Sequence, residues 1–381
     1  MIQLLHLADL HLGKSLYGQS RLEEQKEALE QIIQYVSNHE IDGILLAGDI
    51  FDTKRPSIAA RKLYEDFVLQ VTKHCPLYAV AGNHDQGEGL QLFSSLFAKH
   101  QYYISGTLEY PWAHYQIKKG NALVNIYLLP YYYYTQVKKE YSDTLSEIDW
   151  LRKEIQKLSL NPNEINLLVT HLFVDLYDNQ DFSDLASGSE MITQVGTLEA
   201  LPRELFSDFD YVALGHIHRP QWSVDQKIGY AGALLPYAFD EQMEKSFTLL
   251  TIDNHQMSHK EIPIQYKKNL VTITGTIEEI QQQAPNVPND DYVKLVIQEK
   301  NIVENAKDRF QSLFPNLLTI EQEISQEWIE KERENKELPS LENNLFSYFS
   351  TFYQEKMGEE LNSTQKSYLE EKLQSLDEEI L

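Results

Sequence analysis

The chain has 381 residues, 42% of them hydrophobic, so it is long and apolar enough to bury the cores of two or three globular domains. Its 33 basic and 58 acidic residues give a net charge of −25, which counts against nucleic-acid binding through a basic surface alone. Its single cysteine, Cys75, excludes an intrachain disulfide and a cysteine-built zinc site.

The first residues, MIQLLHLADLHLGK, do not resemble a secretion signal. No charged region precedes the apolar stretch, and His6 and Asp9 interrupt it. No apolar run approaches the length that crosses a membrane. Together with the lone cysteine, these features predict a cytoplasmic protein without membrane association.

Five short apolar runs each end in a residue of a type that can bind metal. In chain order, these runs lie at 2–11, 42–49, 76–85, 165–171 and 211–218. Such runs are typical of strands buried on both faces. Amphipathic helices are predicted at about 20–39 and 57–73. Strands that alternate with helices indicate a layered α/β domain, in which ligands collect at the carboxyl ends of strands.

The pattern changes after about residue 220. Segments 222–234 and 245–253 are predicted to be further strands that close the sheet, and this domain is predicted to end near Pro263. The next segment, 266–330, predicts a small α/β domain with strands at 270–275 and 292–298, a helix at 302–314 and a last short strand. A polar linker, 331–340, then leads to two amphipathic helices within 341–381, the second capped by Asn362 or Ser363.

The candidate metal ligands at these strand ends are Asp9, His11, Asp49, Asn83, His171, His216 and His218. Carboxylate, imidazole and amide ligands without thiolate suit manganese, iron or zinc. Seven ligands are too many for one ion and about right for two, which such sites hold ~3.5–4 Å apart. Asp49, on a central strand, is the predicted bridge. A lone histidine of this kind is more often a hydrogen-bonded core residue. His6 and the other histidines outside these motifs are predicted to be structural or exposed.

The ordered motifs DLHLG, GDIFD, GNHD, an isolated TH and GHIH resemble the signature of the calcineurin-like metallophosphoesterases over roughly residues 1–250. Within that superfamily the chain is most similar to the SbcD family, the nuclease subunits of bacterial SbcCD DNA-repair complexes. This closer similarity rests on the segments RLEEQ (21–25), GDIFDTKRPS (48–57), FDYVALGHIHRPQ (209–221) and YAGALLPYAFDE (230–241).

The resemblance implies a layered β-sandwich flanked by helices at 1–265, a small α/β capping domain at 266–330, a linker at 331–340 and partner-binding helices at 341–381. It assigns Asp9, His11, Asp49 and His218 to one metal ion, and Asp49, Asn83, His171 and His216 to the other, with manganese as the working metal.

The resemblance also implies that His84 is catalytic, either stabilising charge on the phosphate or protonating the leaving 3′ oxygen. The alternative is that His84 only orients its neighbours, and Asp85 is a candidate to orient His84 in turn. Asp52 stands where archaeal and eukaryotic relatives have a histidine, so no role in DNA geometry is carried over to it.

The implied function is exonuclease action on duplex ends and endonuclease action on single strands and hairpins, in DNA repair, recombination and replication. The implied partners are DNA, an SbcC-like coiled-coil ATPase that supplies DNA affinity, and a second copy of the chain in a heterotetramer. Lys54 and Arg55 are best placed to meet phosphates, and Tyr131 to Tyr134 either stack on bases or pack around Pro130.

Two other substrate classes compete with DNA. A phosphoprotein phosphatase is disfavoured because such enzymes typically read GDxVDRG and GNHE, where this chain reads GDIFDTK and GNHD. A phosphodiesterase acting on a small molecule or nucleotide has the same core motifs and remains the alternative. The chain beyond residue 265, which such an enzyme does not need, favours the nuclease.

Overall fold

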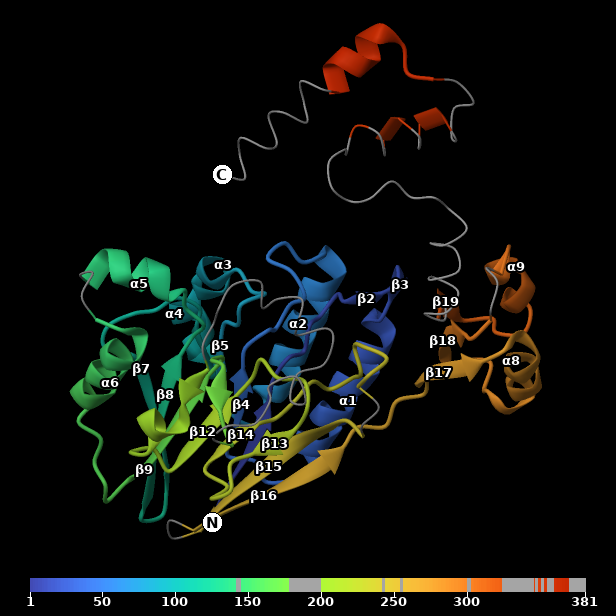
Figure 1. Cartoon of the computed structure of the whole chain (residues 1–381). Coiled ribbons are helices and arrows are strands. Elements are labelled where there is room, and N and C mark those ends of the chain that lie inside the picture. The colour runs from blue at the N-terminus through green and yellow to red at the C-terminus, as the bar shows by residue number, and fades with distance from the viewer. Residues whose placement is uncertain are drawn as a thin grey trace. The chain divides into compact units, whose positions relative to one another are not determined.

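The computed structural model describes residues 1–141, 145–177, 200–241, 244–253, 256–299, 303–323, 346, 349–350, 353–354 and 360–369. Two six-stranded sheets form the centre of the first compact unit (Figure 1). The first sheet has the order β16-β15-β1-β4-β5-β6, and its strands are β1 (Ile2–Leu7), β4 (Gly43–Ala47), β5 (Leu77–Val80), β6 (Tyr102–Ser105), β15 (Ser246–Asp253) and β16 (Gln256–Pro263). The strands β1, β4, β5 and β6 are parallel, and the β15–β16 hairpin pairs with β1 through an antiparallel β15.

The second sheet has the order β13-β14-β12-β9-β8-β7. Its strands are β7 (Ala113–Lys119), β8 (Ala122–Leu129), β9 (Ile165–Thr170), β12 (Tyr211–Leu214), β13 (Gln221–Trp222) and β14 (Ile228–Tyr230). The four central strands are parallel, and the two edge strands are antiparallel to their neighbours. The runs predicted at 165–171 and 211–218 are therefore strands, but they belong to a different sheet from the first three.

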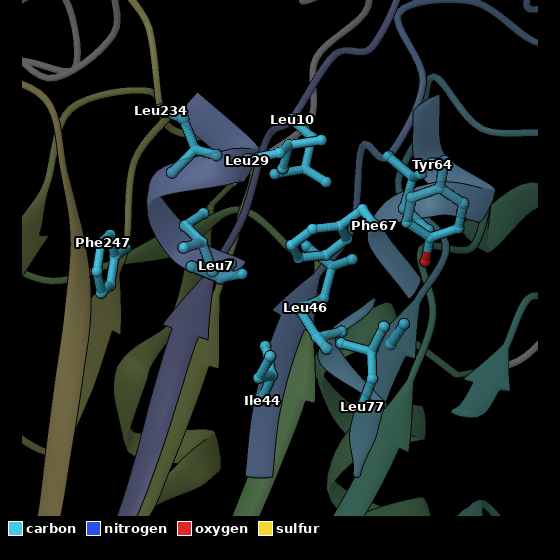
Figure 2. Packing of buried hydrophobic residues seen from close by; sticks show 14 of the residues in the cluster. Leu7, Leu10, Leu29, Ile44, Leu46, Tyr64, Phe67, Leu77, Leu234 and Phe247 are labelled. Carbon is cyan, nitrogen blue, oxygen red and sulfur yellow. The ribbon is translucent and has the colours of Figure 1, made fainter. Parts of the chain in front are cut away.

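Side chains from both sheets form one buried cluster between them, including Leu4 and Leu45 from the first sheet and Ile126 and Leu167 from the second. The helices α1 (Leu22–Asn38) and α2 (Ile58–Val71) cover the outer face of the first sheet. Figure 2 shows Leu46 of β4 close to Phe67 of α2, with Ile44 further along the same strand. The helix α6 (Glu147–Lys157) packs on the outer face of the second sheet. The predicted helix-flanked β-sandwich is confirmed.

Local signals explain where these helices begin. Ser57 caps α2 by accepting a hydrogen bond from the backbone N–H of Ala60, and Ser146 caps α6 by accepting one from Asp149. The shorter elements of this region are β2 (Ser15–Leu16), β3 (Gln19–Ser20), α3 (Gly87–Gln91), α4 (Ser94–Phe97), η1 (Ala98–His100), α5 (Tyr134–Tyr141), β10 (Val174–Asp175), β11 (Leu201–Pro202) and η3 (Arg203–Phe206).

A third, parallel sheet follows, with the order β17-β18-β19. Its elements are β17 (Leu270–Gly275), α8 (Ile277–Gln283), η4 (Ala284–Asn286), β18 (Tyr292–Ile297), α9 (Ala306–Gln311) and β19 (Leu317–Gln322). It has its own hydrophobic cluster, which includes Ile280 and Phe310. Tyr292 connects it to α1, because its hydroxyl donates to Glu24 Oε1 at 2.7 Å. The predicted boundary near residue 265 falls between β16 and β17.

The second compact unit contains the end of the chain. Residues 363–369 are helical, and Asn362 Oδ1 accepts the backbone N–H of Gln365 at 3.0 Å, so the predicted cap at Asn362 is confirmed. The linker 331–340 and most of the apolar positions predicted within 341–381 lie outside the described residues. Among the helices that the structure describes, none is long and apolar enough to cross a membrane.

Candidate metal centre

The seven predicted ligands all follow the carboxyl ends of strands, from β1, β4 and β5 of the first sheet and β9 and β12 of the second. Ligand atoms of Asp9, His11 and His218 lie within 4.8 Å of one another, as do those of Asp9, Asp49 and His171. The two sheets therefore bring their strand ends to one place, which becomes the candidate site.

The backbone at this site is held in unusual conformations. Asp9, His11, Asp49 and His216 have φ values of 52°, 44°, 49° and 95°, in a region that costs a non-glycine residue energy. Gly215 allows the two sheets to approach, because a Cβ there would lie 1.9 Å from the carbonyl oxygen of Ala47. Strain of this kind is typical of functional sites, where the surrounding fold maintains it.

The first predicted ligand set is compact. The Nε2 atoms of His11 and His218 are 3.0 Å apart, and His11 Nε2 is 3.6 Å from Asp49 Oδ2. The carboxylate of Asp9 accepts the backbone N–H of His216 at 2.9 Å, which orients it between the two sheets.

The second predicted set meets the first at Asp49. His171 Nε2 lies 3.2 Å from Asp49 Oδ2 and 3.0 Å from Asn83 Oδ1, and His216 Nδ1 lies 3.2 Å from the same Asn83 oxygen. The oxygen of Asp49 that faces His11 is thus also the one that faces His171, as a bridging carboxylate requires. His216 and His218 point to different neighbours, Asn83 and His11.

The chemistry of the cluster fits bound cations. His171 Nδ1 lies 2.7 Å from the carbonyl oxygen of Ala47 and must carry a proton, so in the neutral form of the ring the Nε2 lone pair faces the oxygens of Asp49 and Asn83. Acceptors that face one another in this way need a positive charge between them. Asp9 and Asp49 are also fully buried, where an unpaired carboxylate is costly.

The pKa values reflect the same concentration of charge. Burial raises the pKa of Asp9 to about 7. Burial alone would lower the pKa of His171, but the nearby Asp49 and Asp9 raise it to about 9. The site therefore attracts positive charge at neutral pH, which protons or a divalent cation can supply.

Comparison with known proteins identifies the family. The model of the calcineurin-like phosphoesterases matches residues 2–220, more than half of the chain. The chain belongs to the calcineurin-like phosphoesterase family. It is therefore a metal-dependent phosphodiester hydrolase, and the residues above are candidates to hold its divalent metals.

Among curated proteins, the SbcD component of the SbcCD nuclease from Staphylococcus saprophyticus is 28% identical over 390 residues, covering 99% of each chain. Among solved structures, an archaeal phosphodiesterase has a TM-score of 0.31 and 12% identity, over 68% of this chain and 100% of its own. A glutamine-dependent NAD+ synthetase from Acinetobacter baumannii has a TM-score of 0.30 and 8% identity, over 97% of this chain and 70% of its own. At these TM-scores neither likeness supports an argument.

In this phosphoesterase His84 lies at the edge of the ligand cluster, half-buried, with its ring 4.9 Å from that of His11. Its Nδ1 is 2.8 Å from the carbonyl oxygen of Asp52, and its backbone N–H donates to Asp49 Oδ1 at 2.9 Å. The side chain is thus held through Nδ1. Its backbone N–H, not its ring, makes the hydrogen bond to the Asp49 carboxylate.

The prediction that Asp85 orients His84 is wrong, because the His84 ring bonds to Asp52 instead. The Asp85 carboxylate accepts the backbone N–H groups of Ile50, Phe51 and Gly82 at 3.1, 2.9 and 2.9 Å. Asp85 therefore joins the loop after β4 to the loop after β5. Asp52 itself pairs with Lys14 at 2.9 Å and lies 3.5 Å from His11 Nδ1.

The tyrosine run divides between packing and the edge of the site. Tyr132 is buried and packs edge-on against Trp150. Tyr131 lies beside the candidate ligand His171, with ring centroids 6.4 Å apart, and Tyr133 is exposed with Lys54 Nζ 5.6 Å from its ring. Tyr132 therefore packs in the core as one of the two alternatives predicted, while Tyr131 and Tyr133 lie at the edge of the candidate site.

Glu241 was not predicted from the sequence. Its Oε1 lies 3.1 Å from His218 Nδ1, although it is 23 residues further along the chain. The segment YAGALLPYAFDE, which carries part of the family resemblance, ends at this residue. Its place in that segment was the one feature of the sequence that could have identified Glu241 as a functional residue.

Proposed function

We propose that this phosphoesterase is the nuclease subunit of an SbcCD-like complex, and that it hydrolyses DNA phosphodiesters with two manganese ions. The observation that carries this proposal is the similarity to the SbcD component of an SbcCD nuclease over 99% of both chains, which includes the third sheet and the C-terminal region. We further propose the activities that the resemblance implies: exonuclease on duplex ends and endonuclease on single strands and hairpins. They would serve DNA repair, recombination and replication in the cytoplasm.

The chain's own residues would then have distinct tasks. Asp9, His11, Asp49, Asn83, His171, His216 and His218 would hold the metals. Two bound divalent ions supply a water that ionises near neutral pH and charge that stabilises the transferring phosphoryl group. His84 would donate a proton to the leaving 3′ oxygen, or a hydrogen bond to the phosphate, from Nε2.

Support for a nucleic-acid substrate comes from the edge of the site. Lys54 and Tyr133 form a cation–π pair there, and Tyr131 lies between Tyr133 and the ligand His171. A lysine can meet a backbone phosphate, while an exposed aromatic ring can stack on a base. The net charge of −25 remains unfavourable for DNA, so we assign most of the DNA affinity to an ATPase partner.

The test compares substrates under one condition. Purified protein with Mn²⁺ should cleave labelled hairpin and duplex DNA, and chelator or Asp49→Asn should abolish cleavage.

Tyr133→Ala should raise the KM for oligonucleotides about 5-fold or more, because base stacking is worth about 1–3 kcal/mol. Tyr133→Phe keeps the ring and should leave this KM unchanged. Neither variant of Tyr133 should alter hydrolysis of bis(p-nitrophenyl) phosphate. Hydrolysis of that compound with no DNA cleavage would favour the alternative, a small-molecule or nucleotide phosphodiesterase.

We propose that the helices of 341–381 bind an SbcC-like coiled-coil ATPase. The apolar positions predicted for them from the sequence, together with the family resemblance, support this. A chain that ends at Pro339 should remain a manganese-dependent hydrolase but should no longer co-purify with its ATPase. Assembly of the truncated chain at full affinity would contradict the assignment.

We also propose that two copies pair through the face formed by α2, α3 and α4, within the implied heterotetramer. Leu69, Leu92, Phe93 and Leu96 are each about half exposed there. Leu69, Leu92 and Phe93 line a cavity of about 480 Å³, together with Val68 and Phe97. Protruding apolar side chains beside a hollow on one face can fit a second copy related by twofold symmetry. Phe93→Asp with Leu96→Asp should convert a dimer to a monomer in light scattering.

A further inference from the structure

A buried ion pair lies behind the candidate ligand His218, and neither member is itself a candidate ligand. Glu241 and Lys245 are 7% and 1% exposed, and Lys245 Nζ lies 2.6 Å from Glu241 Oε2. Burying two charges costs several kcal/mol, so a buried pair adds little net stability even when it is well hydrogen-bonded. Because the pair contributes little to the stability of the core but lies against His218, its location indicates a role at the candidate metal site.

The pair holds both the side chain and the main chain of His218. Glu241 Oε1 lies 3.1 Å from His218 Nδ1, and Lys245 Nζ donates to the His218 carbonyl oxygen at 3.1 Å. The other carboxylate oxygen also accepts the backbone N–H of Tyr237 at 3.2 Å. These contacts leave the imidazole of His218 little freedom to rotate or shift.

The carboxylate also determines which ring nitrogen of His218 carries the proton. An ionised carboxylate only accepts hydrogen bonds, so Nδ1 is the donor and the lone pair stays on Nε2. That Nε2 lies 3.0 Å from His11 Nε2, inside the ligand cluster. A carboxylate behind a ligating imidazole both orients the ring and strengthens it as an electron donor.

The same segment supports the neighbouring ligand His11. The Tyr237 hydroxyl donates to the carbonyl oxygen of Leu10 at 2.7 Å, and Gln25 Nε2 donates to that of His11 at 2.7 Å and to the Tyr237 hydroxyl at 2.9 Å. Residues 237–241 thus contact His218 directly and support the backbone that carries His11.

The second ligand set has a different kind of support. His171 Nδ1 faces a neutral acceptor, the carbonyl oxygen of Ala47, at 2.7 Å. The support from Glu241 is therefore specific to the metal position formed by Asp9, His11, Asp49 and His218.

We propose that Glu241 is the positioning residue for this first metal position: it fixes the tautomer and orientation of His218, and Lys245 holds Glu241 in place. The proposal rests on the two-metal assignment of the proposed function. It predicts that the two positions differ in how their metal affinity depends on Glu241.

The test is Mn²⁺ binding to the metal-free full-length protein, followed by calorimetry and by electron paramagnetic resonance. The wild type should bind two ions. Glu241→Gln, which keeps the shape and removes the charge, should weaken one ion 10- to 100-fold and leave the other unchanged. Glu40→Gln, at an exposed carboxylate, is the matched control and should bind like the wild type.

Two further variants show which position is affected and separate positioning from folding. In a His171→Ala background, whose second position is disrupted, Glu241→Gln should weaken the ion that remains. Glu241→Gln combined with Lys245→Met leaves no unpaired buried charge, so it should melt close to the wild type and still bind the first ion weakly.

Wild-type affinity for both ions in the double variant would overturn the proposal, as would equal weakening of both ions in Glu241→Gln. A wild-type chain that binds fewer than two ions would overturn the two-metal assignment itself, and this proposal with it. The wild-type titration therefore distinguishes failure of the assignment from failure of the role of Glu241.

Discussion

The histidines at positions 216 and 218 show how two residues of one short motif can face different neighbours. In a regular strand, residues two apart point to the same side. The strand β12 ends at Leu214, however, and His216 has a φ of 95°, so its ring turns towards Asn83 while that of His218 faces His11. Gly215 permits this turn because it has no side chain to strike the Ala47 carbonyl.

Replacement of His84 by alanine should separate metal binding from catalysis. The backbone N–H of residue 84, which holds Asp49, survives the substitution, so both ions should bind as in the wild type. Cleavage should fall about 100-fold or more, because a general acid or charge stabiliser is lost. Single-turnover cleavage with saturating Mn²⁺ measures this. His74→Ala, at an exposed histidine, is the control, and wild-type cleavage by His84→Ala would make His84 a structural residue.

The helices and strands of the first unit were largely predictable from the sequence, because apolar runs bounded by polar residues define buried strands. The predicted helix at 20–39 is Leu22–Asn38 and the predicted strand at 270–275 is Leu270–Gly275. The residue pattern alone could not divide the strands between two sheets. A strand buried on both faces shows the same continuous apolar pattern whether a helix or a second sheet covers it. The resemblance to a known family implied a β-sandwich, but it did not assign the individual strands to the two sheets.

The ligands were predictable for a similar reason, since each follows a recognisable strand. The supporting residues were not. Glu241 reaches His218 across 23 residues, and Asp52 contributes its carbonyl oxygen to His84, an atom that every residue possesses. Asp85 was assigned to its sequence neighbour, but its carboxylate bonds to Ile50 and Phe51 on another loop. Such contacts depend on how loops pack in three dimensions.

At the junction of β4 and β12, Gly215→Ala should damage fold and metal binding together. The new Cβ would lie 1.9 Å from the Ala47 carbonyl oxygen and 2.7 Å from His171 Nδ1, so the two strand ends must separate. We expect a loss of about 3 kcal/mol in the free energy of unfolding, typical of severe overpacking, and weaker binding of the second ion.

Urea unfolding and Mn²⁺ titration measure the two effects of this substitution. The matched control is Gly89→Ala in α3, where the nearest atom to a new Cβ is the flexible Gln86 side chain at 3.2 Å. The control should behave like the wild type. A Gly215→Ala protein with unchanged stability and two tightly bound ions would show that the strands tolerate a wider separation.

At the scale of the whole molecule, His6 joins the two sheets through the core. It lies on β1 of the first sheet, fully buried, and contacts two groups of β12 in the second. Its Nδ1 is 3.0 Å from the Tyr211 hydroxyl, and its Nε2 is 3.0 Å from the carbonyl oxygen of Leu214. A neutral ring satisfies both contacts, with Nε2 donating and Nδ1 accepting. The prediction of a structural histidine is consistent with this geometry.

This arrangement makes stability depend on pH. Burial lowers the pKa of His6 to about 3, against 6.5 for the free side chain. Between these values the unfolded chain binds a proton that the folded chain cannot, so stability falls as pH drops below 6.5 and levels off near 3. The lost stability should reach about 2 kcal/mol at pH 5, since each pH unit below 6.5 contributes about 1.4 kcal/mol.

His6→Gln should remove this dependence while keeping a donor for the Leu214 carbonyl. The variant will be less stable than the wild type at pH 7.5, because the Tyr211 hydroxyl loses its acceptor. Urea unfolding in chelator should show the difference between the two proteins shrinking by about 2 kcal/mol from pH 7.5 to pH 5. His74→Gln, at an exposed histidine, should follow the wild type across that range. If instead the stabilities of wild type and His6→Gln run parallel with pH, His6 is protonated inside the folded core, and the two sheets are joined by a charged ring.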